Sequence, residues 1–126
     1  VSASGTADAI ELGACGIANI KPGRVGGYLE AVRIHDLCVA KNVPVWCGGM
    51  LETGIGRAAN AVLAALPGFT LPGDISASTR FYAQDIVIDP ITITDGHVTV
   101  PTSPGLGFEL DQTFLDQVTT RTTTLR

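Results

Sequence analysis

The chain has 126 residues, a formal net charge of -4 and 45% apolar residues, which is typical of one globular domain or of part of a larger protein. Its composition is neither basic nor rich in aromatic residues, which argues against nucleic acid as a partner. No apolar run approaches the length that crosses a bilayer, so we also expect no membrane partner.

The three cysteines, Cys15, Cys38 and Cys47, are widely spaced and form no C-x-x-C pair. This spacing argues against a disulfide framework or a zinc site, and it favours reduced thiols in a cytoplasmic protein. No basic segment followed by an apolar one opens the chain, so we expect no secretory signal. Because the first residue is Val1 and not Met, we interpret the chain as a processed product or a fragment.

Helical and strand patterns alternate over about the first hundred residues, with short connections that are typical of a parallel sheet. Ser4 or Thr6 is expected to cap a first helix that runs to about Ala14. The fold class predicted from this alternation is α/β.

A strand is predicted at residues 17–21, where it meets Pro22. Side chains of a strand alternate between its two faces, so Asn19 and Lys21 are expected to share one face. The lysine therefore ends a strand on the same side as the amide.

A helix is predicted after Gly27, because apolar residues recur there at helical spacing. The expected stripe consists of Tyr28, Ala31, Val32, His35, Cys38 and Val39. A histidine within such a stripe is more often a satisfied core residue than a base. A second strand is predicted at residues 43–47, followed by two glycines.

Thr53 is expected to cap a helix of small and apolar residues that runs from about Ile55 to Leu66. A third strand is predicted at residues 69–71, before the turn that holds Asp74. The predicted order is thus helix, strand, helix, strand, helix, strand.

The pattern changes from about Gln84 onward. Antiparallel strands are expected at residues 86–88, 91–94 and 98–100, around an Asp95-Gly96 turn. Asp111 is expected to cap a short last helix with Phe114, Leu115 and Val118 turned inward. We expect the threonine-rich tail after Thr119 to be frayed.

Polar groups at the carboxyl ends of parallel strands line the functional sites of α/β proteins. Three such ends carry notable residues here: Lys21, then residues 48–52, then Asp74. We expect them to converge on one pocket. The alternative is that these residues have no functional role: the lysine is solvated, and Glu52 and Asp74 are acidic turn residues.

Glycine-rich turns can also bind phosphate at the start of a helix. Gly23, Gly26 and Gly27 stand at such a position, but their spacing matches neither the dinucleotide fingerprint nor the P-loop. A small α/β module that binds an anion without catalysis stays open as an alternative on this basis.

Four stretches carry a resemblance: NIKPGRVGGYLEAVRIHDLC, VPVWCGGMLETGIGRAAN, LPGDISAS and PTSPGLGFEL. Together they resemble the C-terminal part of the enolase superfamily, in the branch that contains o-succinylbenzoate synthase and N-acylamino-acid racemase. The resemblance implies about strands 6 to 8, with their helices, of a modified (β/α)8 TIM barrel over residues 1–82. It implies that residues 83–126, a terminal β-hairpin and helix, return to a capping domain. The capping domain itself and the first barrel strands are expected to be absent.

By this resemblance Lys21 ends the sixth barrel strand and is one of two acid/base lysines. The residues implied to line the substrate cavity are Asn19, Gly48, Gly49, Met50, Glu52 and Asp74. The implied reaction removes the proton α to a carboxylate from a small carboxylate substrate. Sites of this superfamily are a known example of a lysine or histidine base acting beside Mg²⁺, so this chemistry is carried by the resemblance alone.

The resemblance also implies Mg²⁺ or Mn²⁺ as cofactor. Its ligands and the partner lysine are expected on earlier strands, upstream of Val1. Asp8 and Glu11 lie where the family has no ligand. We therefore expect no metal site in this chain, and no turnover by it alone. Its expected partners are the missing N-terminal part of the same protein and, once complete, further copies in a homo-oligomer.

The branch leaves several activities open. We expect o-succinylbenzoate synthase, a lyase of menaquinone biosynthesis, with N-acylamino-acid (N-succinylamino-acid) racemase as the second choice. The GGMLETG run is shared with muconate-cycloisomerase-like and dipeptide-epimerase relatives, whereas NIKPGRVGG favours the synthase and racemase branch. A non-catalytic fragment is the alternative of another class.

Overall fold

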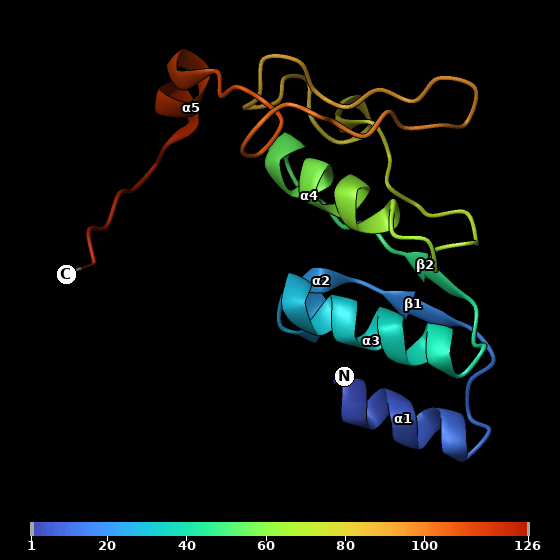
Figure 1. The fold of residues 1–126 in the computed structure, drawn as a ribbon. Helices are drawn as coiled ribbons and strands as arrows, with labels where there is room; N and C mark the ends of the chain where they lie inside the picture. Colours follow the sequence, from blue (N-terminus) through green and yellow to red (C-terminus); the bar gives the residue numbers. More distant parts are fainter. Residues whose placement is uncertain (1, 126) are drawn as a thin grey trace.

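The computed structural model describes residues 2–125 as an α/β chain with a small parallel sheet. Its elements are α1 (Ala3–Glu11), β1 (Ala18–Ile20), α2 (Pro22–Val25), α3 (Tyr28–Ala40), β2 (Val45–Cys47), α4 (Gly54–Ala64), the 3-10 turn η1 (Ser78–Arg80) and α5 (Gln112–Val118). Figure 1 shows α1, α3 and α4 stacked in chain order along the two strands. The long segment after α4 runs across the far side of that helix.

The two strands confirm the predicted parallel pairing. The register places Ala18 opposite Val45, Asn19 opposite Trp46 and Ile20 opposite Cys47. Ile20, Val45 and Cys47 are buried beneath the helices, together with Ala31, Ile34 and Cys38 of α3 and Leu63 of α4. Since side chains alternate along a strand, Asn19 and Trp46 lie on the opposite face. One face of this sheet therefore forms the core, and the other is free to carry polar groups.

The first helix begins earlier than predicted. Ser2, and neither Ser4 nor Thr6, is its N-cap, because its Oγ accepts a hydrogen bond from the Gly5 amide at 3.2 Å. Thr6 instead donates its hydroxyl to the Ser2 carbonyl at 2.9 Å from inside the helix. The helix ends at Glu11 and not at Ala14, and Gly13 follows it with a positive φ of 65°.

The helix predicted after Gly27 is confirmed, but its buried stripe differs from the expected one. The buried residues are Ala31, Ile34, His35 and Cys38. Of the expected set, Val32 is only partly buried, and Tyr28 and Val39 are exposed. His35 is a satisfied core residue: Nε2 accepts from the Gly68 amide at 3.1 Å, and Nδ1 lies 2.8 Å from Asp36. Its ring also stacks on Phe69.

The third predicted strand, residues 69–71, is not formed as a strand. Its backbone makes one hydrogen bond to β2, from Leu71 N to Val45 O at 3.4 Å. A strand requires a continuous ladder of such bonds, and a single bond does not provide it.

The predicted antiparallel strands are also mostly absent from the described residues. Two isolated bridges remain, between Val87 and Leu110 and between Thr94 and His97. The turn between the second pair is as predicted, because Asp95 and Gly96 have φ values of 50° and 77°, the conformation of a type I′ turn.

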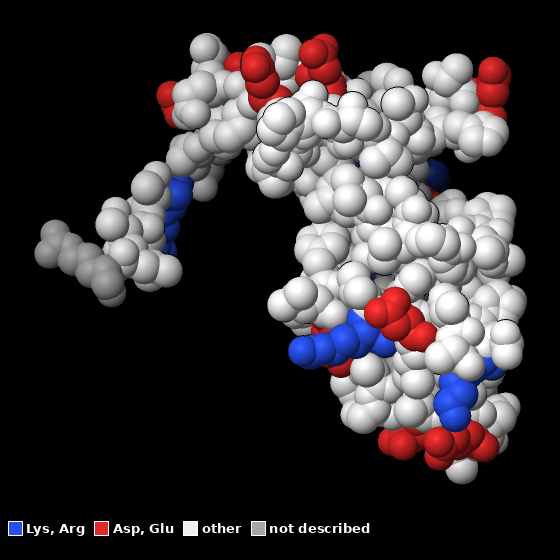
Figure 2. Space-filling model, viewed as in Figure 1, with Lys and Arg blue, Asp and Glu red and all other residues white. Residues whose placement is uncertain are grey.

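The last helix confirms Asp111 as its N-cap, since Oδ1 accepts from the Phe114 amide at 2.9 Å. The expected inward set is wrong in part, because α5 has no buried residue and Val118 is exposed. Within residues 2–125, no helix is both long and apolar enough to cross a membrane. On the face shown in Figure 2, basic and acidic side chains lie side by side over α1 and α3, and mainly acidic groups stand out on the segment after α4.

Candidate active site

Lys21 stands at the carboxyl end of β1, on the side of the sheet away from the helices. It is also the N-cap of α2, with an extended backbone (φ -115°, ψ 108°), and Pro22 begins that helix. Pro22 therefore does more than end the strand, because proline suits the first position of a helix. The lysine side chain is 23% exposed, and its Nζ donates a hydrogen bond to the Gly49 carbonyl at 2.5 Å.

Gly48 and Asn19 complete the wall around the lysine stem. A β-carbon on Gly48 would collide with Asn19 Oδ1 and would lie 2.7 Å from Lys21 Cε. Since atoms in contact approach to about 3.5–4.0 Å, only glycine leaves room here. The end of β2 thus allows the side chains of β1 to cross over it.

Asp74 is the acidic neighbour of the lysine. Its Oδ2 lies 3.7 Å from Lys21 Nζ, and its Oδ1 accepts a hydrogen bond from the Gly49 amide. A β-carbon on Gly49 would lie 3.0 Å from the Asp74 carbonyl, so glycine again permits the close approach. The Asp74 side chain is 52% exposed, so the carboxylate is held by these contacts more than by packing.

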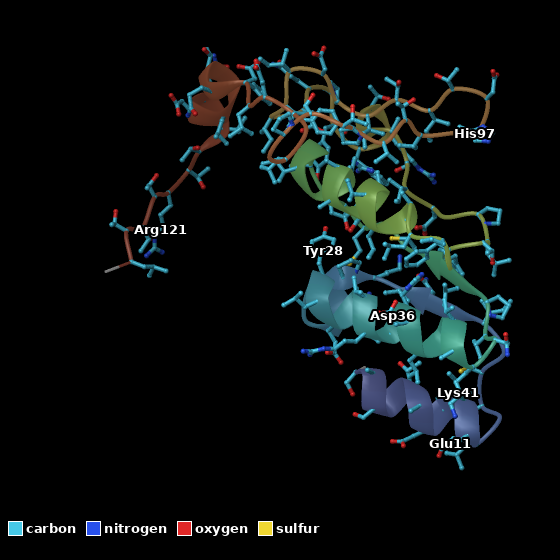
Figure 3. The ribbon with its side chains drawn as sticks, in the orientation of Figure 1. Glu11, Tyr28, Asp36, Lys41, His97 and Arg121 are labelled. Atoms are coloured by element: carbon cyan, nitrogen blue, oxygen red, sulfur yellow. The ribbon has the colours of Figure 1, made fainter. Side chains whose placement is uncertain are left out.

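Glu52 fixes the loop that follows β2. Its Oε2 accepts from the Met50 amide at 2.7 Å, and its Oε1 accepts from Asn60 Nδ2 at 3.1 Å. Asn60 Oδ1 in turn accepts from the Tyr28 hydroxyl at 2.9 Å. Figure 3 shows Tyr28 between α3 and α4, where it can bridge the two helices. Met50, partly exposed, lies over Gly23.

Burial and nearby carboxylates keep two groups at this site protonated. Burial, then the charges of Asp74 and Glu52, together raise the pKa of the Cys47 thiol to about 11, against the opposing effect of Lys21. Burial also raises the pKa of the Tyr28 hydroxyl, followed by the effects of Glu52 and Cys47. Both groups are therefore neutral near pH 7, and Tyr28 is available as a hydrogen-bond donor.

The structure brings Lys21, Asn19, Gly48, Gly49 and Asp74 into contact and places Met50 and Glu52 on the adjoining loop. Sequence reasoning missed Asn60, which is almost fully buried. A signal was present, because a buried amide in a helix of small apolar residues requires polar partners.

Among residues 2–125, no group of three His, Cys, Asp or Glu side chains could hold a metal ion. The Asp74 carboxylate is occupied by the Gly49 amide and the lysine amine, and the Glu52 carboxylate by the Met50 amide and Asn60. This donor set does not fit a resident divalent cation.

Comparison with known proteins identifies the family. The sequence model of the "Enolase C-terminal domain-like" family matches residues 1–114. This chain belongs to that family. The match covers both strands, all the residues around Lys21, and the segment after α4, so the enolase C-terminal domain extends over nearly the whole chain.

Two curated relatives illustrate the branch. An N-succinylamino acid racemase from Amycolatopsis sp is 64% identical over 120 residues, which cover 95% of this chain and 32% of the relative. An o-succinylbenzoate synthase from Bacillus subtilis is 56% identical over 113 residues, covering 90% of this chain and 30% of the relative. This enolase C-terminal domain chain therefore spans about a third of the length of the curated relatives that it matches.

A solved structure supports the same fold. The dipeptide epimerase from Cytophaga hutchinsonii, complexed with Mg and the dipeptide D-Ala-L-Val, superposes with a TM-score of 0.82 at 26% identity. The matched region covers 92% of this chain and 32% of the epimerase.

Proposed function

We propose that this chain is part of a longer enzyme that removes the proton α to the carboxylate of a small substrate. The observation that carries the proposal is the Lys21 amine, which the Gly49 carbonyl and the Asp74 carboxylate hold at the shared carboxyl ends of β1 and β2. Residues at that end of parallel strands supply the catalytic groups of barrel enzymes. The names of the two curated relatives support this chemistry.

We propose that β1 and β2 are about the sixth and seventh strands of a (β/α)8 barrel, with residues 69–74 in the place of the eighth. The two faces of the sheet support this, since one packs under α3 and α4 and the other carries Asn19 and Lys21. Residues 1–82 would then be barrel and residues 83–126 would return to a capping domain. The exposed apolar side chains of the later segment, such as Ile88 and Leu106, support a covering partner.

In the proposed racemisation Lys21 Nζ takes a proton from the substrate α-carbon, or delivers one to it, and the partner lysine does the opposite. In the proposed dehydration the partner lysine removes the α-proton and the Lys21 ammonium contributes its positive charge. The hydrogen bond to Gly49 O and the nearby Asp74 carboxylate orient the amine, and Asn19 and Gly48 restrict its stem. Good alignment of a base with the reacting atom accounts for a large part of such catalysis. Gly48, Gly49, Met50, Glu52, Asn19 and Asp74 are the proposed substrate-binding residues.

The enediolate formed by α-proton removal needs positive charge to stabilise it. Mg²⁺, or Mn²⁺, is the proposed source, supported by the Mg in the related dipeptide epimerase structure. Because residues 2–125 contain no cluster that fits the ion, we propose that its ligands come from the part of the enzyme upstream of this chain.

The proposed activity is o-succinylbenzoate synthase, the dehydration that belongs to menaquinone biosynthesis. N-succinylamino acid racemase is the second candidate, favoured by the 64% identity to the Amycolatopsis racemase. A cytoplasmic location is also proposed, supported by the three free cysteines, two of them buried. The complete enzyme is proposed to form a homo-oligomer.

The test is made on the full-length protein, with and without Mg²⁺. Dehydration of the cyclohexadiene precursor and racemisation of an N-succinylamino acid are measured for the wild type and Lys21→Ala. We expect the variant to lose roughly 10²–10⁴-fold in kcat, the usual contribution of a general acid or base. Lys41→Ala, which alters an exposed lysine at the far end of α3 (Figure 3), is the matched control and should keep its activity.

Full activity in Lys21→Ala would contradict the proposed role of the lysine. A wild type that is folded but inactive in both reactions would favour the non-catalytic alternative.

A further inference from the structure

Arg57 is a buried cation that the proposed mechanism does not use. It lies in the first turn of α4, and only 1% of its surface is exposed. Its Nη1 donates to the Ser76 carbonyl at 2.7 Å and is 3.2 Å from Ser76 Oγ. The guanidinium also lies over the Phe81 ring, 5.1 Å from its centre. One side chain thus ties α4 to the segment that follows Asp74.

Burying an arginine here is unfavourable for stability alone. Among the described residues, its Nε and Nη2 are buried without a hydrogen-bond partner. A buried charge or donor that is not fully paired costs free energy, and an apolar side chain of similar volume would avoid that cost. The contact with Ser76 is therefore the feature that calls for an explanation.

Ser76 connects this contact to the proposed site. It follows Asp74 by two residues, in a stretch that is neither helix nor strand and has no ladder of its own. The half-exposed Asp74 carboxylate reaches the Gly49 amide and lies beside the Lys21 amine. Two anchors hold the short stretch: Gly49 at Asp74, and Arg57 at Ser76.

We propose that Arg57 is a positioning residue that holds the Asp74 carboxylate beside the Lys21 amine. The inference rests on the proposed function of Lys21. Without the guanidinium, the Ser76 carbonyl loses its donor and residues 74–76 gain freedom. The carboxylate then leaves its place, and the amine loses one of the two groups that orient it. A displacement of about 1 Å at a reacting group can slow a reaction about 100-fold.

The test uses full-length protein with Arg57→Met, which keeps an apolar chain of similar length, and Arg57→Lys, which keeps the charge. We expect Arg57→Met to lose about 100-fold in kcat, with a clearly smaller rise in KM because Asp74 is also a proposed substrate-binding residue. Arg57→Lys should recover about 10-fold of that loss, because one ammonium can bond the Ser76 carbonyl without the planar fork.

Arg33→Met is the matched control, since Arg33 is exposed on α3 and pairs with Glu30. It should keep the wild-type kcat and KM. Lys21→Ala is measured in parallel. If Lys21→Ala keeps its activity, the proposed function fails and the role of Arg57 falls with it. If Lys21→Ala is inactive but Arg57→Met keeps its kcat, only the positioning role is overturned.

Folding is checked first by circular dichroism and thermal unfolding. Should Arg57→Met not fold, Arg57→Lys decides the matter on its own. A lower kcat with a clearly smaller rise in KM in folded Arg57→Lys would support the proposal. A wild-type kcat, or a rise in KM as large as the fall in kcat, would overturn it.

Discussion

Residues 2–66 and residues 69–125 differ in the interactions that stabilise them. The first region contains both strands, four helices and nearly all the core, and its helices pack on the strands and on each other. The second contains one 3-10 turn, one seven-residue helix and two isolated bridges, and several large apolar side chains there are exposed. Figure 1 shows this segment spread over α4 without a sheet of its own. The first region packs mainly on itself, whereas the second is held against it by separate contacts, such as Phe69 on His35, Leu71 on Val45 and Ser76 on Arg57.

The largest expected effect comes from truncating one buried and one exposed isoleucine, one in each region. Ile34→Ala empties a buried position between α3 and the strands and should lower the free energy of unfolding by about 2–5 kcal/mol. Ile88→Ala, at an exposed position, should cost less than about 0.5 kcal/mol in the 126-residue chain. Urea unfolding followed by circular dichroism measures both. A cost at Ile88 as large as that at Ile34 would show that the second region has a core of its own.

The proposed capping domain predicts a further difference for the substitution at Ile88. In the full-length protein Ile88→Ala should become more destabilising than in the 126-residue chain, because the side chain is then removed from water. An equal, small cost in both would contradict the proposal that residues 83–126 pack against a capping domain.

A second substitution tests the junction between the two regions. Gly48→Ala adds a β-carbon where the Lys21 stem and the Asn19 amide already lie, so Lys21 must move. We expect kcat of the full-length enzyme to fall by about 100-fold. Gly13→Ala is the control: it also changes a glycine, with a positive φ but no neighbouring atoms, and should affect stability without affecting kcat.

The smallest expected effect is a pH dependence within the first region. The Ala3 amide and then Arg33 hold the pKa of Glu30 below its ordinary value of 4.5. Since the folded-state pKa is lowered, this contribution is present above pH 4.5 and disappears as the pH falls through the folded value. The protection factor of the Ala3 amide, which compares its exchange rate with that of an unstructured chain at the same pH, should therefore fall in acid, whereas Glu30→Gln should show the weaker dependence. Identical profiles for the two proteins would contradict this linkage.

Sequence predicted the helices better than the strands, for a physical reason. A helix satisfies its own backbone, so capping and spacing locate α3 and α5 from local residues alone. Residues 69–71 have strand-like side chains, but their ladder depends on a neighbour, and the single bond from Leu71 to Val45 is all that the described chain supplies. The residues at 69–71 are of the types that strands favour, but the described chain does not supply a neighbouring strand with which they form a ladder.

The candidate site likewise contains contacts that sequence predicts and contacts that it does not. Period-two alternation predicts that Asn19 and Lys21 share a face, and parallel pairing brings the end of β2 beside them. The contacts of Asn60 with Glu52 and of Arg57 with Ser76 depend on how α4 is rotated against the chain beyond it. No local pattern records that rotation. These residues were therefore found only in the structure.

Pro22 gives the site a property that exists before folding. A proline restricts the residue before it to extended backbone, and Lys21 has that conformation in the structure. The unfolded chain thus already samples the geometry that points the lysine away from the helices. The peptide bond to proline thus restricts the backbone of Lys21 even in the unfolded chain. Less conformational entropy is therefore lost when folding places the amine.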